Sequence, residues 1–341
     1  MLFDTLYGQN EIKKILADMI ANDRVSHAFV FCGPSGIGRK SFAKKLAEAL
    51  MCPCRENGQI EPCGICVSCT LMRNDTNPEY VVIAEDPGKK TIGVGAIRNM
   101  QEDLAKAPEY GRKKVYVIDP ADKLTEEAQN ALLKTIEEPP EYGQIILVCA
   151  NISLLIETVR SRVVRLDFAR NSDQDVLKAF DAQKQRRMAE GEAIPEVPDE
   201  MICGYADGII GRALEIQNYD VFLTLREKGL EILRLLPGSR VDFLIRFSQY
   251  FEKHAEYKEF LFFTLNSLLR DIMLLGRYGH EAKLQNAYAK DVLQKLSDEI
   301  DYHQAMRCIQ ILQEAWTMLG KNVNYKLTVD STAIKLQEAL K

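Results

Sequence analysis

Short apolar runs alternate with helix-like stripes of apolar residues through the first half of the chain. The runs are bounded by polar or turn-forming residues, which is typical of buried strands, and they cover residues 27–32, 80–84, 114–119, 145–150 and 163–168. Between them, apolar side chains recur three or four positions apart, most clearly in residues 11–21, 94–104 and 128–138. Strands that alternate with helices favour a parallel sheet. The pattern therefore predicts an α/β fold whose five-stranded parallel sheet has helices on both faces.

The strand pattern ends near Ser172, and the rest of the chain shows helical spacing only. Pro237-Gly238-Ser239 can end one helix and begin the next. The longer helices are expected at residues 220–236, 239–253, 256–278, 287–298 and 301–319. We expect three domains, at residues 1–170, 171–216 and 217–341.

The overall composition is that of a globular, water-soluble protein. Of 341 residues, 46% are hydrophobic and 27% are charged. No apolar run approaches the roughly 18 residues that a membrane helix needs. The net charge is −5, so any contact with nucleic acid must come from a local face or from an assembly. The first residues, Met1-Leu2-Phe3-Asp4, lack the basic and apolar regions of a signal peptide, and we expect a cytoplasmic protein.

A glycine-rich loop follows the first apolar run. Its sequence, Gly33-Pro34-Ser35-Gly36-Ile37-Gly38-Arg39-Lys40-Ser41, nearly matches the loop G-x-x-x-x-G-K-[ST], whose backbone N–H groups surround a phosphate. Gly33 and Gly38 have the required spacing. Arg39 stands at the lysine position, Lys40 replaces the hydroxyl that holds Mg²⁺, and Ser41 comes one residue late. Because lysine cannot ligate Mg²⁺, the loop should keep its backbone and lose part of its chemistry.

The apolar strand expected at 114–119 ends in Asp119, where a nucleotide-hydrolysing site keeps its Mg²⁺-linked carboxylate. In such a site the next residue is a glutamate that polarises the attacking water. Here the next residue is Pro120, which has no acid–base function. The sequence therefore predicts a degenerate nucleotide site, with weak or absent binding of ATP or ADP.

Five of the nine cysteines fall within residues 52–69. Four of them, Cys54, Cys63, Cys66 and Cys69, have the spacing C-x8-C-x2-C-x2-C, which suits a structural Zn²⁺ site with no open coordination position. Cys52 competes with Cys54 as the first ligand. We favour Cys54, because Cys52 directly follows an apolar helix end and is expected to pack there. The alternative to a metal site is a set of free thiols in a loop.

Several stretches of the chain occur together in one known family. They are Gly8-Gln9, the glycine loop, the cysteine insert, Ser161-Arg162 and the run Asn130-Ala131-Leu132-Leu133-Lys134-Thr135-Ile136-Glu137-Glu138-Pro139-Pro140. This combination resembles the bacterial DNA polymerase III clamp-loader subunits of the AAA+ superfamily. The resemblance implies an AAA+ module, a small helical lid domain and a C-terminal helical collar domain that joins subunits into a ring. It also implies that the ring loads a sliding clamp onto primed DNA, with gamma/tau motor and delta subunits as partners.

Within this family, three departures favour the delta prime branch over the ATP-hydrolysing motor. They are Arg39-Lys40 in the glycine loop, Pro120 after Asp119, and Gly211, which aligns with the motor's second-sensor arginine. Three losses at one site are not expected of a working ATPase. The resemblance therefore implies a subunit that does not hydrolyse ATP on its own.

Arg162 is the residue for which the resemblance implies a catalytic role. Ser161-Arg162 corresponds to the family's S-R-C motif, with Val163 in place of the cysteine, and its arginine is offered to ATP on the neighbouring motor. Such an arginine finger in trans is worth ~10³–10⁵ in rate in GTPases. The alternative interpretation is that Arg162, like Arg160, is an exposed arginine in a local ion pair.

Two other functions stay open from the sequence. One is a true ATPase in which a one-residue bulge brings Lys40 and Ser41 into the working positions, although Pro120 argues against it. The other is a zinc-dependent nucleic-acid-binding module. The cysteines favour such a module, but no basic stretch with interspersed aromatic residues surrounds them.

Overall fold

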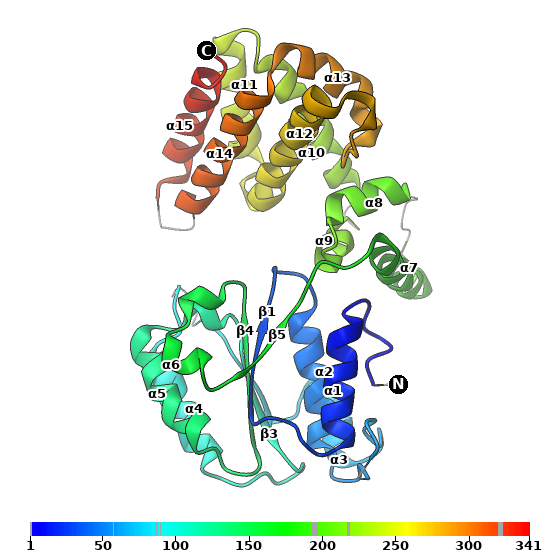
Figure 1. Cartoon of the computed structure of the whole chain (residues 1–341), viewed down its shortest axis with the longest axis vertical. Coiled ribbons are helices and arrows are strands. Elements are labelled where there is room, and N and C mark those ends of the chain that lie inside the picture. Colours follow the sequence, from blue (N-terminus) through cyan, green and yellow to red (C-terminus); the bar gives the residue numbers. More distant parts are fainter. Residues whose placement is uncertain are drawn as a thin grey trace. The chain divides into compact units, whose positions relative to one another are not determined.

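The computed structural model describes residues 2–341 except 57, 86, 87, 89, 193–196, 217, 218 and 320–322. These residues form two compact units (Figure 1). Unit 1 is Met1–Gln183 with Gly208–Arg212, and unit 2 is Lys184–Asp207 with Ala213–Lys341. The division falls within two helices, α7 (Asp173–Ala189) and α9 (Ile210–Glu215). The three-domain division expected from the sequence, with boundaries at residues 170 and 216, stays a prediction.

Unit 1 is built on a five-stranded parallel sheet, which confirms the predicted fold class. The strands are β1 (Ala28–Cys32), β2 (Tyr80–Ile83), β3 (Lys114–Ile118), β4 (Gly143–Cys149) and β5 (Val164–Asp167). They lie in the order β2-β3-β4-β1-β5, and Phe29 of β1 pairs with Ile146 of β4 and Val164 of β5. The carboxyl ends of β1, β3 and β4 therefore meet at one edge of the sheet, which is the usual place for a ligand in such folds.

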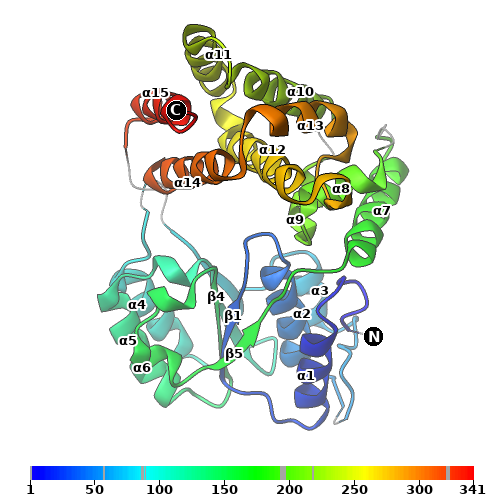
Figure 2. The same cartoon turned by 45° about the horizontal axis from the view of Figure 1, so that its top comes forward.

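Side chains of the strands alternate between two hydrophobic cores, as the pleat of a strand requires. Phe29 and Phe31 belong to one core, whereas Val30 between them belongs to the other. Helices α1, α2 and α3 cover the first face, and α4, α5 and α6 cover the second (Figures 1 and 2). The bounds of these helices are α1 (Asn10–Ala21), α2 (Arg39–Met51), α3 (Val67–Arg73), α4 (Val94–Leu104), α5 (Glu126–Glu137) and α6 (Glu157–Arg160).

Unit 2 contains only helices among the residues that the structure describes. Besides the parts of α7 and α9 that belong to it, they are α8 (Asp199–Ala206), α10 (Tyr219–Leu235), α11 (Arg240–Lys253), α12 (Lys258–Tyr278), α13 (Lys290–Glu299), α14 (Tyr302–Leu319) and α15 (Tyr325–Glu338). Helix α12 packs against α10, α13 and α14, so its buried leucines form the centre of this core. Across both units, no described helix is long and apolar enough to span a membrane.

Helix α15 was not predicted, whereas the other long helices of unit 2 lie close to their expected positions. Its buried face consists of Thr328, Val329, Thr332, Ala333 and Leu336. Small and hydroxyl-bearing residues give a weak apolar stripe in the sequence. They nevertheless pack well, since Thr328 and Thr332 bond their hydroxyls to carbonyls one turn earlier.

A core substitution in α12 should destabilise unit 2 strongly. Leu268 is fully buried, so Leu268→Ala should cost about 2–5 kcal/mol of unfolding free energy by leaving a cavity. The control is Leu327→Ala on α15, whose side chain is 67% exposed and should change stability by no more than about 0.5 kcal/mol. Urea unfolding followed by circular dichroism measures both. Equal small losses for the two variants would contradict this placement of α12.

Candidate functional site

The glycine loop joins β1 to α2 and keeps the backbone of a phosphate-binding loop. Gly33, Gly36 and Gly38 have φ values of 152°, 79° and 109°, a region that other residues rarely adopt. Helix α2 begins at Arg39, and the N–H of Phe42 donates to the carbonyl of Gly38 at 3.0 Å. The helix therefore starts in regular register, with no inserted residue. Its free N-terminal N–H groups can attract an anion.

The two cationic residues after Gly38 have different environments. Arg39 is only 9% exposed, and its Nη1 has no hydrogen-bond partner within the described part of the chain. The side chain of Lys40 is 61% exposed, and its Nζ lies 3.9 Å from Oδ2 of Asp119. Ser41 is exposed on α2. An ammonium group thus stands beside the carboxylate that a nucleotide site uses for Mg²⁺.

Asp119 is the acidic group of this site and directly follows β3. Its N–H donates to the carbonyl of Ile83 at 3.0 Å, which fixes the backbone at the end of the strand. Burial raises the pKa of its carboxyl group, while the positive charges of Lys40 and Arg39 act in the opposite direction. Pro120 follows and supplies neither a side-chain acceptor nor a backbone donor. The immediate neighbour of Asp119 therefore cannot act as a general base.

The segment Gly208–Arg212 packs on the glycine loop within unit 1. The N–H of Gly211 donates to the carbonyl of Gly36 at 2.9 Å. A Cβ atom at position 211 would lie 2.8 Å from the Cα of Gly36, closer than real Cβ contacts come. A second-sensor arginine, expected at this position in the motor subunits, would therefore require the backbone here to move.

Arg162 lies between α6 and β5, with its backbone and side chain both held. Its N–H donates to the carbonyl of Val159 at 3.1 Å. Its Nη1 donates to the carbonyl of Thr158 at 3.0 Å and to Oγ of Ser161 at 3.2 Å. Its Nε lies 2.5 Å from Oε1 of Glu137, the last residue of α5. The local ion pair that the sequence left open as an alternative is therefore present, and a role toward a neighbouring subunit stays a proposal.

Four cysteines of the insert gather into one cluster. The Sγ atoms of Cys52, Cys63, Cys66 and Cys69 all lie within 4.8 Å of one another. Those of Cys63 and Cys69 are 4.0 Å apart, close to the separation of about 3.8 Å that tetrahedral Zn–S bonds of about 2.3 Å produce. Backbone N–H groups of Cys63, Cys66 and Cys69 donate to the sulfurs of Cys52, Cys63 and Cys66 at 3.3, 3.4 and 3.5 Å. Because such bonds stabilise thiolates, the cluster fits a closed zinc site.

The structure differs from the sequence prediction at the first of these cysteines. Cys54 is exposed and does not belong to the cluster, whereas Cys52 does. We favoured Cys54 because Cys52 was expected to pack against the helix end. Cys52 is indeed buried, but its burial does not turn its Sγ away from the other three sulfurs. The geometry therefore corrects the first ligand from Cys54 to Cys52.

Sequence reasoning also missed Glu137 and the contact between Gly36 and Gly211. Glu137 was noted only as part of a family-like stretch, and nothing in its spacing connects it with Arg162. Its position at the C-terminus of α5 was the available signal, since a carboxylate there is unfavourable with the helix dipole and needs a cationic neighbour. The contact of the two glycines depends on tertiary packing, so no local pattern could have revealed it.

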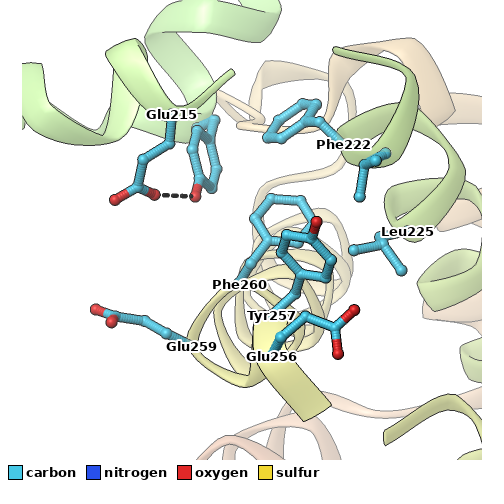
Figure 3. A pocket seen from close by; sticks show the side chains of 9 residues that line it. Glu215, Phe222, Leu225, Glu256, Tyr257, Glu259 and Phe260 are labelled. Atoms are coloured by element: carbon cyan, nitrogen blue, oxygen red, sulfur yellow. Dashed lines mark hydrogen bonds between the residues drawn. The ribbon is translucent and has the colours of Figure 1, made fainter. Parts of the chain in front are cut away.

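A separate cavity of about 280 Å³ lies in unit 2 (Figure 3). Tyr205 contacts Phe222 and Phe260 there with ring centroids 4.8 and 5.2 Å apart, and its hydroxyl donates to Glu215 at 3.0 Å. Phe260 points into this cavity (Figure 3). None of the residues that line it comes from the glycine loop, the cysteine cluster or the surroundings of Arg162.

Comparison with known proteins relates the whole chain to replication proteins. A family model described as DNA polymerase III, delta subunit, matches residues 8–172. The DNA polymerase III subunit delta' of Bacillus subtilis (strain 168) is 27% identical over 340 residues, which cover 97% of this chain and 96% of that one. The DNA polymerase III subunit tau of the same organism is 35% identical over 219 residues, which cover 63% of this chain and only 37% of that one. A solved gamma-subunit-related protein of Thermotoga maritima is 18% identical, with a TM-score of 0.42 over 96% of this chain and 99% of that one.

The matched region contains the features described above. Residues 8–172 include the glycine loop, the cysteine cluster, Asp119 and Arg162. The similarity to the delta' relative extends beyond this region to nearly the full length of both chains. The chain is therefore similar to DNA polymerase III clamp-loader subunits, over residues 8–172 to the family model and over nearly its whole length to the delta' relative.

Proposed function

We propose that this chain is the delta prime subunit of a bacterial DNA polymerase III clamp loader and does not hydrolyse ATP by itself. It joins gamma/tau motor subunits and a delta subunit in a hetero-pentameric ring. Through that ring it helps to place the sliding clamp on primed DNA. It acts in the cytoplasm and needs no membrane partner.

The observation that carries this proposal is the ammonium of Lys40, 3.9 Å from the Asp119 carboxylate. In a hydrolysing site this carboxylate and a hydroxyl at position 40 would share a Mg²⁺ ion that bridges the phosphates. A lysine there offers three N–H donors and no acceptor, so it cannot be a metal ligand. The missing base at Pro120 supports the same conclusion.

The alternative function is an ATP-hydrolysing motor of the gamma/tau type, favoured by the intact backbone of the glycine loop. That alternative needs a bulge that moves Lys40 and Ser41 by one position. The regular bond from Phe42 to Gly38 argues against a bulge. The extent of the similarities points the same way, because the similarity to the B. subtilis delta' subunit covers 97% of this chain and that to the tau subunit covers 63%.

We further propose that Arg162 acts as an arginine finger on ATP bound to a neighbouring motor subunit. Its side chain is 40% exposed, and the last turn of α6 holds its backbone. A guanidinium on a firm support is suited to neutralise charge that develops on a γ-phosphate. The chain's own glycine loop has lost its Mg²⁺ ligand, so a neighbour's nucleotide is the better target.

The cysteine cluster is proposed to hold one structural Zn²⁺ ion through Cys52, Cys63, Cys66 and Cys69. Four thiolates would complete a tetrahedral shell and leave no position for a reacting water. The ion would tie the end of α2 to α3, since Cys52 follows α2 and Cys69 lies in α3. Its role is therefore to order the insert and not to take part in catalysis.

The isolated chain should not hydrolyse Mg-ATP at a measurable rate. The lysine at position 40 cannot ligate the metal, and Pro120 cannot accept a proton from the attacking water. Phosphate release by the purified chain measures this. Lys40→Ala and, as a control for loss of positive charge on α2, Lys44→Ala should both stay at the background rate. Steady turnover that is lost in Lys40→Ala but kept in Lys44→Ala would show instead that Lys40 works in a motor site.

Arg162→Ala should leave the chain folded and able to assemble, since the side chain is partly exposed. It should slow ATP hydrolysis at the adjacent motor site by roughly 10³-fold or more, by analogy with GTPases. Total ATP turnover of the reconstituted ring, stimulated by DNA and clamp, should then fall by the fraction that this one site contributes. The rate of clamp loading should fall with it. Arg160→Ala is the matched control. Wild-type rates for Arg162→Ala at low and saturating ATP would rule the role out.

The purified chain should contain about one equivalent of zinc, measured by elemental analysis of protein prepared without chelators. Cys52→Ser should lose most of it, because the remaining three thiolates no longer close the shell. Cys54→Ser should retain it. Zinc that survives in Cys52→Ser and disappears in Cys54→Ser would restore the ligand set predicted from the sequence.

A further inference from the structure

The ion pair between Glu137 and Arg162 joins two helices that pack against each other. Glu137 ends α5, Arg162 follows α6, and the two helices are in direct contact. Val159 of α6 is fully buried in the core beneath, and its packing holds the helix that precedes Arg162. Both charged side chains are still accessible, with 40% of Arg162 and 47% of Glu137 exposed. The pair therefore forms on a rigid platform but lies at the surface, where a partner can reach it.

We propose that Glu137 is a positioning residue, which holds and neutralises Arg162 in the free chain until the nucleotide of a neighbouring subunit replaces it. This inference rests on the proposed role of Arg162 and adds the residue that controls it. A carboxylate 2.5 Å from Nε cancels much of the positive charge that a γ-phosphate would otherwise experience. Glu137 and a phosphate would also repel each other. Arg162 can therefore bind the phosphate well only after the pair opens.

The remaining contacts of Arg162 favour such an exchange. Nη1 donates to the carbonyl of Thr158 and to the hydroxyl of Ser161, and both acceptors are neutral groups at the end of α6. These two bonds can hold Nη1 in place while Nε exchanges the Glu137 carboxylate for a phosphate oxygen. Glu137 is the charged partner among these three contacts of Arg162. Removing its charge should therefore change the electrostatic environment of Arg162 more than the position of the Arg162 side chain.

The strength of the pair limits the size of the effect. Exposed ion pairs are weak, because water screens them and two long side chains must be ordered. Opening this pair should therefore oppose nucleotide engagement by no more than about fivefold. A restraint of this size should reduce the engagement of Arg162 with the neighbour's nucleotide when ATP is scarce. Saturating ATP should overcome it.

Glu137→Gln tests the inference, because glutamine keeps the size of the side chain and removes its charge. In the reconstituted ring, this variant should lower the KM for ATP by about two- to fivefold and leave kcat unchanged. The matched control is Glu138→Gln, which removes the adjacent exposed carboxylate and should behave as wild type. In the double variant Glu137→Gln/Arg162→Ala the gain should vanish, since Glu137 acts only through Arg162.

The pair itself can be observed in the isolated chain by NMR of arginine labelled with ¹⁵N at Nε. The Arg162 resonance should shift in Glu137→Gln and stay in place in Glu138→Gln. An unshifted resonance, or an unchanged or raised KM for Glu137→Gln, would overturn the inference. If Arg162→Ala itself hydrolyses ATP at the wild-type rate, the proposed function fails. If Arg162→Ala slows hydrolysis and Glu137→Gln matches wild type at every ATP concentration, only the role of Glu137 fails.

Discussion

The ammonium of Lys40 beside the Asp119 carboxylate decides what the phosphate loop of this chain can do. The carboxylate lies at the end of β3 as in a hydrolysing site, and the loop keeps the glycine conformations that a phosphate requires. The ammonium of Lys40 lies 3.9 Å from that carboxylate. In the function proposed above, electrostatic attraction for an anion survives this replacement and metal-assisted hydrolysis does not, because a lysine cannot complete the metal shell.

Unit 1 carries both the glycine loop and Arg162, to which the proposed function gives different roles. At the loop, the contact between Gly36 and Gly211 leaves no space for a side chain, so backbone fills part of the surroundings of the phosphate site. At the end of α6, Arg162 retains a guanidinium on a firm base and a carboxylate partner in Glu137. This arrangement fits the proposed role of Arg162 toward a nucleotide that another chain holds.

Most of the fold could be predicted because apolar strands and striped helices produce local patterns. The five strands and the helices on both faces of the sheet followed from such patterns, whereas α15 escaped because Thr328, Thr332 and Ala333 form much of its buried face. The departures of the glycine loop from the phosphate-loop motif could be read from the sequence residue by residue. The choice of Cys52 over Cys54, the partner of Arg162 and the contact at Gly211 could not, because each depends on how distant segments meet in three dimensions.

The metal dependence of nucleotide binding tests the central claim most directly. The isolated chain would be titrated with a fluorescent ATP analogue in the presence of Mg²⁺ and again in a buffer prepared without Mg²⁺. With Lys40 at the metal position, any binding should be equally weak in both conditions. Binding that tightens tenfold or more when Mg²⁺ is added would show that a metal shell still forms at Asp119, and would contradict this description of the site.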